Sequence, residues 1–201
     1  MIRDLLAVRA GGGERDAVVL RLCASPNYDA RPEGVVPNVV VVHAISLPPD
    51  SFGGPGVEQL FTNTLDPAEH PYYADIQHLR VSAHYFVRRD GEVVCFVAPE
   101  HRAWHAGVSC WNGRERCNDF SIGIELEGCD TQPFEPVQYV RLAGLIAELR
   151  TRYPIEAVVG HSDIAPGRKT DPGPFFDWQR LERLLRMGDD MRAPGHPHVK
   201  F

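Results

Sequence analysis

The sequence predicts a single α/β domain, built on a central mixed β-sheet that is flanked by helices. Three observations support this fold class: strand-like runs alternate with helical patterns, a hairpin signal requires one antiparallel pair, and no repeat divides the 201 residues. With 43% hydrophobic and 24% charged residues, the chain has the composition of a folded globular protein.

The domain is expected to cover most of the chain. We place it at residues 25–188, preceded by an N-terminal segment, 1–24, that packs on the domain or leads into it. Residues 189–201 have no periodicity and are expected to form a mobile C-terminal tail.

Two short apolar runs each end at a histidine. Val39–Val42 is β-branched throughout, which predicts a strand buried on both faces, and His43 follows it directly. Ala157–Gly160 is a second short apolar strand, and His161 lies just beyond its end. Because ligands of open α/β sheets bind at the carboxyl ends of strands, both histidines are candidates for a functional site.

Two further patterns predict the middle of the sheet. His84–Arg88 and Glu92–Val97 are strand-like runs separated by Asp90-Gly91, two residues that tolerate positive φ and therefore indicate a tight hairpin. Ser121–Glu127 alternates strictly, with isoleucine and leucine side chains on one face. The other face carries Ser121, Gly123, Glu125 and Glu127.

Helices are predicted in four places. Short helical patterns lie near Val57–Phe61 and Tyr72–Leu79. Pro136 suits the first turn of a longer helix, whose apolar positions follow the i, i+3, i+4, i+7 rule at Leu142, Leu145, Ile146 and Leu149. Asp177 is a favourable N-cap for a last helix, and Gly188 predicts its C-terminal end.

Charge and cysteine content exclude several classes of protein. The formal charge of −6 argues against a protein that coats nucleic acid or anionic lipid, so neither partner is expected. No run approaches the ~20 apolar residues of a membrane span, and the N-terminus is a poor signal peptide. The five cysteines include no CxxC pair, which indicates reduced thiols. We therefore expect a cytoplasmic protein and, by default, a monomer.

The loop that follows the second histidine carries a third candidate ligand. Its sequence, GHSDIAPGRKTDPGP, is rich in proline and glycine and therefore stiff, which suits a loop that holds a catalytic group. His43, His161 and Asp171 together would supply two imidazoles and one carboxylate. That set is typical of a catalytic zinc site, although ferrous iron uses the same ligands. The alternative interpretation is a surface turn with an ordinary charge pair.

Two more residues are candidates for chemistry beside such a metal. Glu125 shares a strand face with Gly123, which leaves space above the sheet, so its carboxylate can lie in a cleft and activate water. Lys169 stands two residues before Asp171 and projects the same way in extended backbone. The structural alternative for Glu125 is an exposed glutamate paired with an arginine.

Three residues of the middle segment have two interpretations each. Trp104 and His105 either line the cleft as walls for a sugar or pack within their own loop. His84 either orients a metal ligand or makes a structural hydrogen bond.

Four long segments resemble the AmpD-type N-acetylmuramoyl-L-alanine amidases, which are cytosolic zinc enzymes of peptidoglycan recycling. These segments are VVHAISLPPDSFGGPG, HPYYADIQHLRVSAHYFVRRDGEVV, RAWHAGVSCWNGRERCNDFSIGIELEG and GHSDIAPGRKTDPGPFFDW. The resemblance covers about Ser25 to Trp178 and implies the fold that these enzymes share with T7 lysozyme-type amidases, a peptidoglycan recognition protein-like amidase fold. It also implies zinc-dependent hydrolysis of the amide bond between (1,6-anhydro-)N-acetylmuramic acid and L-alanine of imported muropeptides.

The resemblance assigns roles to five positions of the candidate site. The zinc ligands of the family match His43, His161 and Asp171. Its catalytic glutamate matches Glu125, and its catalytic lysine matches Lys169. We expect the lysine to stabilise the oxygen that becomes negative during hydrolysis.

Substrate contacts follow from the resemblance as well. Arg116 and Arg80 fall where the family contacts substrate, and local arginines would offset the repulsion between an acidic protein and an anionic stem peptide. One departure is visible, because asparagine is expected after the first zinc histidine and this chain has Ala44. That difference concerns a contact to the sugar or to the loop rather than the metal ligands.

Two other functions compete with a zinc amidase. A binding module of related fold would recognise muropeptides without cutting them, but relatives of that sort lack part of the metal set that this chain has. A metallopeptidase would cut within the peptide, but the sequence contains no HExxH motif.

Overall fold

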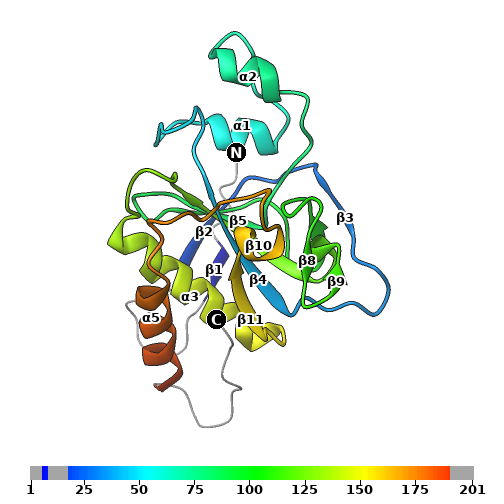
Figure 1. Ribbon diagram of the computed structural model, residues 1–201, viewed down its shortest axis with the longest axis vertical. Helices are drawn as coiled ribbons and strands as arrows, with labels where there is room; N and C mark the ends of the chain where they lie inside the picture. The colour runs from blue at the N-terminus through cyan, green and yellow to red at the C-terminus, as the bar shows by residue number, and fades with distance from the viewer. Residues whose placement is uncertain (1–5, 9–17, 191–201) are drawn as a thin grey trace.

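The computed structural model describes residues 6–8 and 18–190 of the chain (Figure 1). Within these residues the main sheet has seven strands, which are β1 (Leu6–Val8), β2 (Val18–Leu22), β4 (Val39–Ile45), β5 (Tyr85–Val87), β6 (Val93–Cys95), β10 (Ser121–Glu127) and β11 (Ala157–Gly160). Their order is β1-β2-β6-β5-β10-β4-β11. The pairs β1–β2 and β5–β6 are antiparallel and the other neighbours are parallel, so the predicted mixed sheet is confirmed.

Smaller elements surround this sheet. Two ribbons pair β3 (Tyr28–Ala30) with β7 (His101–Ala103) and β8 (Cys110–Trp111) with β9 (Arg114–Glu115). The helices are α1 (Gly56–Phe61), α2 (Pro71–Ile76), α3 (Pro136–Arg152), α4 (His161–Ile164) and α5 (Trp178–Asp190), with one 3₁₀ turn, η1 (Cys117–Asp119). In the described ranges, no helix is long and apolar enough to cross a membrane, and the five cysteines form no disulfide.

Strand β4 is longer than its valine run predicts. It continues through His43 to Ile45, and Val39–Val42 are buried on both faces, as predicted. Because β10 and β11 both pair with β4 in parallel, the carboxyl ends of three strands meet at one edge of the sheet. The register places Glu125 of β10 directly beside His43.

The predicted hairpin joins β5 to β6, but its turn is wider than a two-residue turn. Gly91 has a positive φ of 88°, whereas Asp90 does not. The Gly91 amide donates to the carbonyl of Arg88, and the Arg88 amide donates to the carbonyl of Glu92. A turn closed by one left-handed glycine therefore takes the place of the tight turn.

One face of the sheet is covered by α3 and α5, which lie side by side (Figure 1). The alternating residues of β10 that point to this face are fully buried, and α3 packs over them through Leu142, Leu145, Ile146 and Leu149. Helix α3 begins at Pro136, as predicted, and the side chain of Gln138 accepts the Glu135 amide at 2.9 Å.

The predicted N-terminal end of α5 is confirmed, but its predicted C-terminal end is wrong. Oδ1 of Asp177 accepts the Arg180 amide at 2.8 Å, which is the predicted N-cap. The helix continues to Asp190, so the predicted end at Gly188 is wrong. A glycine within a helix costs only about 1 kcal/mol, which is too little to end the helix by itself. The rest of the predicted tail, 191–201, lies outside the described residues.

The opposite face of the sheet is covered in two separate places. One apolar cluster forms under α1, and Ile45 of β4 packs against it. A second cluster forms under α4 and η1 and includes Val39 and Val41 of the same strand. His43 therefore projects between the two clusters, and this gap is where the candidate site lies.

Truncation of the α3 core should cost far more stability than truncation of its outer surface. Leu142→Ala is expected to lower the free energy of unfolding by about 2–5 kcal/mol, because Leu142 is fully buried and the cavity persists. Val140→Ala is the matched control, since Val140 is 49% exposed on the same helix and should change stability by less than about 0.5 kcal/mol. Urea unfolding of both variants measures the difference, and equal losses would contradict the assigned packing of α3.

Candidate metal centre

Three candidate ligands meet at the carboxyl edge of the sheet. Nδ1 of His43 lies 2.9 Å from Nδ1 of His161 and 3.1 Å from Oδ2 of Asp171. Nδ1 of His161 lies 3.0 Å from the same carboxylate oxygen. Both histidines are buried, and the Asp171 side chain is 16% exposed. The three donor atoms are therefore close enough to share one ion.

The local chain path explains how ligands from two distant segments meet. Parallel pairing of β11 with β4 sets Gly160 beside Val42, so His161 follows β11 at the level of His43. The Ser162 amide donates to the carbonyl of Asp171 at 2.9 Å, which returns the stiff loop to the start of α4. These backbone contacts hold the carboxylate of Asp171 next to both imidazoles.

The outer nitrogen of His161 shows which way this ring is protonated. Nε2 of His161 lies 3.1 Å from the carbonyl oxygen of Ala106. A carbonyl only accepts hydrogen bonds, so Nε2 carries a proton, and in the neutral form of the ring the lone pair is on Nδ1. Burial lowers the pKa of the neighbouring His43 to about 4, which favours the neutral form of that ring.

The donor set fits a divalent metal ion. In the neutral tautomer, the lone pair on Nδ1 of His161 faces a carboxylate oxygen and another imidazole nitrogen, and this arrangement is favourable only when a proton or a metal cation lies among the three atoms. Two imidazoles and one carboxylate are the ligands of catalytic zinc, which keeps a further position for water or substrate. Ferrous iron accepts the same donors, so the ligand atoms alone do not select the metal.

Glu125 lies beside this centre with its charge largely unpaired. Its backbone pairs with that of His43, so both side chains project from the same face of the sheet. Glu125 is buried, and Oε2 has no hydrogen-bond partner within the described part of the chain. Burial raises its pKa well above the usual value, the charge of Asp171 adds to this rise, and Lys169 opposes it. A buried carboxylate with a raised pKa next to a metal-ligand set is a candidate proton acceptor.

Lys169 opens onto a cavity that reaches one of the candidate ligands, His161. This cavity of about 250 Å³ is lined by His161 and Lys169, and also by Arg80, Trp104 and His105. Two of the three predicted substrate contacts, Arg80 and Trp104, therefore share a cavity with His161. The predicted wall position of Trp104 is found, while Arg80 already donates to the carbonyls of Gln77 and Leu79.

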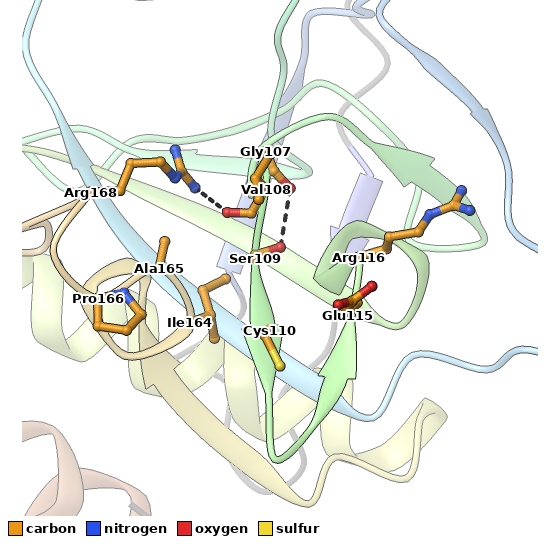
Figure 2. Close-up of a pocket in the computed structure, with 10 residues that line it drawn as sticks. All are labelled: Gly107, Val108, Ser109, Cys110, Glu115, Arg116, Ile164, Ala165, Pro166 and Arg168. Carbon is orange, nitrogen blue, oxygen red and sulfur yellow. Dashed lines mark hydrogen bonds between the residues drawn. The ribbon is translucent and has the colours of Figure 1, made fainter.

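A neighbouring cavity of about 530 Å³ carries the third predicted contact, Arg116 (Figure 2). Arg116 and Arg168 lie on opposite sides of the β8–β9 ribbon in this view. Nη2 of Arg168 donates to the carbonyls of Ala106 and Val108, at 2.8 and 2.6 Å, so this guanidinium forms a wall between the two cavities. The Arg116 side chain is 70% exposed, and its Nε lies 3.4 Å from Oδ2 of Asp119.

The structure also decides the interpretation of His84 that the sequence leaves open, and it locates Ala44. His84 is buried; its Nδ1 accepts the Gly123 amide at 3.0 Å and its Nε2 lies 3.1 Å from the carbonyl of His101, which is the structural role. Ala44 packs on the α3 side of β4, the face opposite to that of His43. The departure from the expected asparagine therefore leaves the metal ligands untouched.

The sequence does not predict which groups contact the outer nitrogens of the two candidate histidine ligands: it singles out His105 only as a cleft wall or a loop residue, and it does not single out Ala106 or Asn118. The carbonyl oxygen of Ala106 lies 3.1 Å from Nε2 of His161, and Nδ1 of His105 lies 2.9 Å from Nε2 of His43. Oδ1 of Asn118 accepts the backbone amide of His105 at 3.1 Å and that of Ala106 at 2.8 Å. The signal that could have found this arrangement is Gly123, because its missing side chain makes room for the His105 ring.

Comparison with known proteins shows that the chain is similar to a family of amidases. A family model described as N-acetylmuramoyl-L-alanine amidase matches residues 33–174. The 1,6-anhydro-N-acetylmuramyl-L-alanine amidase AmpD of Citrobacter freundii is 59% identical over 167 residues, which cover 82% of this chain and 89% of that protein.

Two solved structures are also similar. A crystal structure of selenomethionine AmpD superposes with a TM-score of 0.82 at 54% identity, covering 90% of this chain and 99% of that one, which confirms the amidase fold. The Escherichia coli amidase AmiD, in complex with anhydro-N-acetylmuramic acid-L-Ala-D-gamma-Glu-L-Lys, has a TM-score of 0.54 at 34% identity, covering 77% and 60%.

The unpaired carboxylate of Glu125 should destabilise the metal-free protein at high pH. Its folded-state pKa is raised above the ordinary value of 4.5, so unfolding restores the ionised form and stability falls as the pH rises through the folded-state pKa. Glu125→Gln should therefore be more stable than the wild type at neutral pH and equal to it below pH 4.5. Urea unfolding of the metal-free proteins across this range measures the difference.

The control for this prediction is Glu33→Gln, because Glu33 is exposed and is not among the residues that line the cavity beside the site. Its unfolding free energy should follow that of the wild type at every pH. A stability advantage of Glu125→Gln that does not change with pH would contradict the raised pKa.

Proposed function

This chain belongs to the N-acetylmuramoyl-L-alanine amidase family, and we propose that it hydrolyses the amide bond between 1,6-anhydro-N-acetylmuramic acid and L-alanine of muropeptides, with zinc as cofactor. The observation that carries the proposal is the convergence of His43, His161 and Asp171 beside the buried carboxylate of Glu125. The names of the relatives support the choice of the anhydro sugar.

The three converging side chains would hold the zinc ion. A zinc ion held there would supply Lewis acidity, which favours attack of water on an amide carbonyl near neutral pH. Zinc is preferred to iron because amide hydrolysis needs no change of oxidation state, and because the family is typically zinc-dependent.

Glu125 has the properties of the general base. Its unpaired Oε2 can accept a proton from the attacking water, and its raised pKa lets it hold that proton and then transfer it to the leaving amine.

Lys169 has the position of an electrostatic stabiliser. Its ammonium group is close enough to affect the pKa of both His43 and Glu125, and it borders the cavity that His161 lines. A cation there can stabilise the oxygen that becomes negative when the amide carbonyl is attacked.

The two cavities suggest how the substrate lies. Trp104 offers an apolar wall for the sugar in the cavity beside the metal ligands, with Arg80 at the same cavity. Arg116, on the neighbouring cavity, is mostly exposed and is available to a carboxylate of the stem peptide. Arg168 is held by two carbonyls, so we assign it to the wall between the cavities.

The proposal includes a biological setting. We place the protein in the cytoplasm, where it acts as a monomer on imported muropeptides in cell-wall recycling. Its relatives act on the anhydro sugar according to their names, and the chain's formal charge of −6 argues against nucleic acid or anionic membranes as partners.

Mass spectrometry of the products tests this function directly. Incubation with a synthetic anhydromuramyl tripeptide should release the intact tripeptide and the free sugar, and a chelator should abolish the reaction until zinc is restored. Cleavage within the peptide would indicate a peptidase instead. Tight binding without cleavage by the zinc-loaded protein would indicate a binding module, and cleavage unaffected by removal of all metal would overturn the zinc mechanism.

Removal of the Lys169 charge should separate catalysis from metal binding. Lys169→Ala is expected to keep stoichiometric zinc and to lower turnover by about 100–1000-fold, the usual effect of losing one donor to a developing oxyanion. Steady-state rates together with metal content measure both effects. Turnover close to that of the wild type would remove Lys169 from the mechanism.

A further inference from the structure

A chain of hydrogen bonds runs from His43 away from the metal centre. Nε2 of His43 lies 2.9 Å from Nδ1 of His105, and Nε2 of His105 lies 3.2 Å from Oγ of Ser121. The Ser121 hydroxyl donates to the carbonyl of Cys117 at 2.6 Å. The chain therefore ends at a backbone group that can only accept.

That end sets the direction of every bond in the chain. The single hydroxyl proton of Ser121 is used on the carbonyl of Cys117, so Oγ accepts and Nε2 of His105 donates to it. A neutral His105 then has its lone pair on Nδ1 and accepts the Nε2 proton of His43. Consequently the lone pair of His43 is on Nδ1, the atom that faces His161 and Asp171.

We propose that His105 is a positioning residue of the metal centre, which fixes the tautomer and the orientation of His43 without being a metal ligand itself. The inference rests on the proposed zinc site and names a residue that acts through one of its ligands. Groups that accept a proton from metal-bound histidines typically change metal affinity by 10–100-fold when they are removed.

The surroundings of His105 are built to hold its ring. A Cβ at Gly123 would come within 2.4 Å of the His105 ring, so only glycine at this position of β10 leaves the space that the ring occupies. Oδ1 of Asn118 accepts the amides of His105 and Ala106. Two consecutive residues of one anchored segment thereby contact the outer nitrogens of both metal histidines.

Two substitutions of similar shape test the proposal. His105→Asn keeps an acceptor atom at the position of Nδ1, whereas His105→Leu has nearly the same size and no acceptor. Competition with a chromophoric chelator, performed on purified full-length proteins, should show zinc binding weakened by about 10–100-fold in His105→Leu. His105→Asn should remain much closer to the wild type, because the acceptor for His43 is retained.

The tautomer of His43 provides a second readout that needs neither zinc nor turnover. Long-range ¹H–¹⁵N correlation spectra of the metal-free wild type should show His43 protonated at Nε2. In His105→Leu the proton should move to Nδ1, where Oδ2 of Asp171 lies 3.1 Å away and can accept it. His105→Asn should keep the proton on Nε2.

The outcomes separate positioning from packing. Wild-type zinc affinity in His105→Leu would overturn the proposal, and so would an equal loss of affinity in both variants with an equal loss of metal-free stability. If His105→Leu does not fold, Ser121→Ala removes the end of the chain without altering His105 and should weaken zinc binding in the same direction. A wild type that binds no zinc would refute the proposed cofactor, while the spectra of the metal-free protein would still decide the role of His105.

Discussion

The site depends on a repulsion that the fold must hold in place. Two imidazole nitrogens and one carboxylate oxygen lie 2.9–3.1 Å apart and are largely removed from water. Without a proton or a metal cation among them, these atoms would separate if their backbones were free to move. They are not free, because β4, β10 and β11 pair in parallel within a sheet that is buried on both faces, and the loop of Asp171 is joined to α4 by the Ser162 amide. Rigid strands and a stiff loop thereby preorganise a cation site before any ion binds.

The same sheet explains why catalytic chemistry is confined to one place. On the face opposite α3, apolar clusters occupy both ends of the strands, and β4 contributes residues to each of them on either side of His43. Polar side chains in the gap between the clusters are therefore partly desolvated, which strengthens their mutual electrostatic effects. Lys169 approaches from the rim and affects both His43 and Glu125, so one positive charge acts on a ligand and on the proposed base together.

Much of the site could be predicted from the sequence, because its ligands follow from strand patterns. Valine runs locate the strand ends and hence His43 and His161, and strict alternation puts Glu125 on the same face as Gly123. The groups that contact the outer nitrogens of the two histidines could not be predicted. They come from the segment around His105 and Asn118, which has no periodicity, and one of them is a backbone carbonyl, which every residue carries.

The sequence also does not show which arginines are already bound within the protein and which can reach a ligand. Arg114 stacks on Phe120 and Arg168 donates to two carbonyls, while Arg116 is mostly exposed. A single glycine was also a poor predictor of a helix end: α5 continues through Gly188 to Asp190, because the small cost of one glycine is less than the stabilisation from the rest of the helix.

Glu125 distinguishes an enzyme from a module that merely binds muropeptides. Burying a carboxylate whose Oε2 finds no partner among the described residues is unfavourable, and burial is the main cause of its raised pKa. A binding protein would gain by replacing this residue with an uncharged one, because a ligand that is only held does not need a group that takes up and releases a proton. An amidase needs such a group, since its attacking water must lose a proton and its leaving amine must gain one. The unfavourable burial of Glu125 is therefore best explained as a property that catalysis requires.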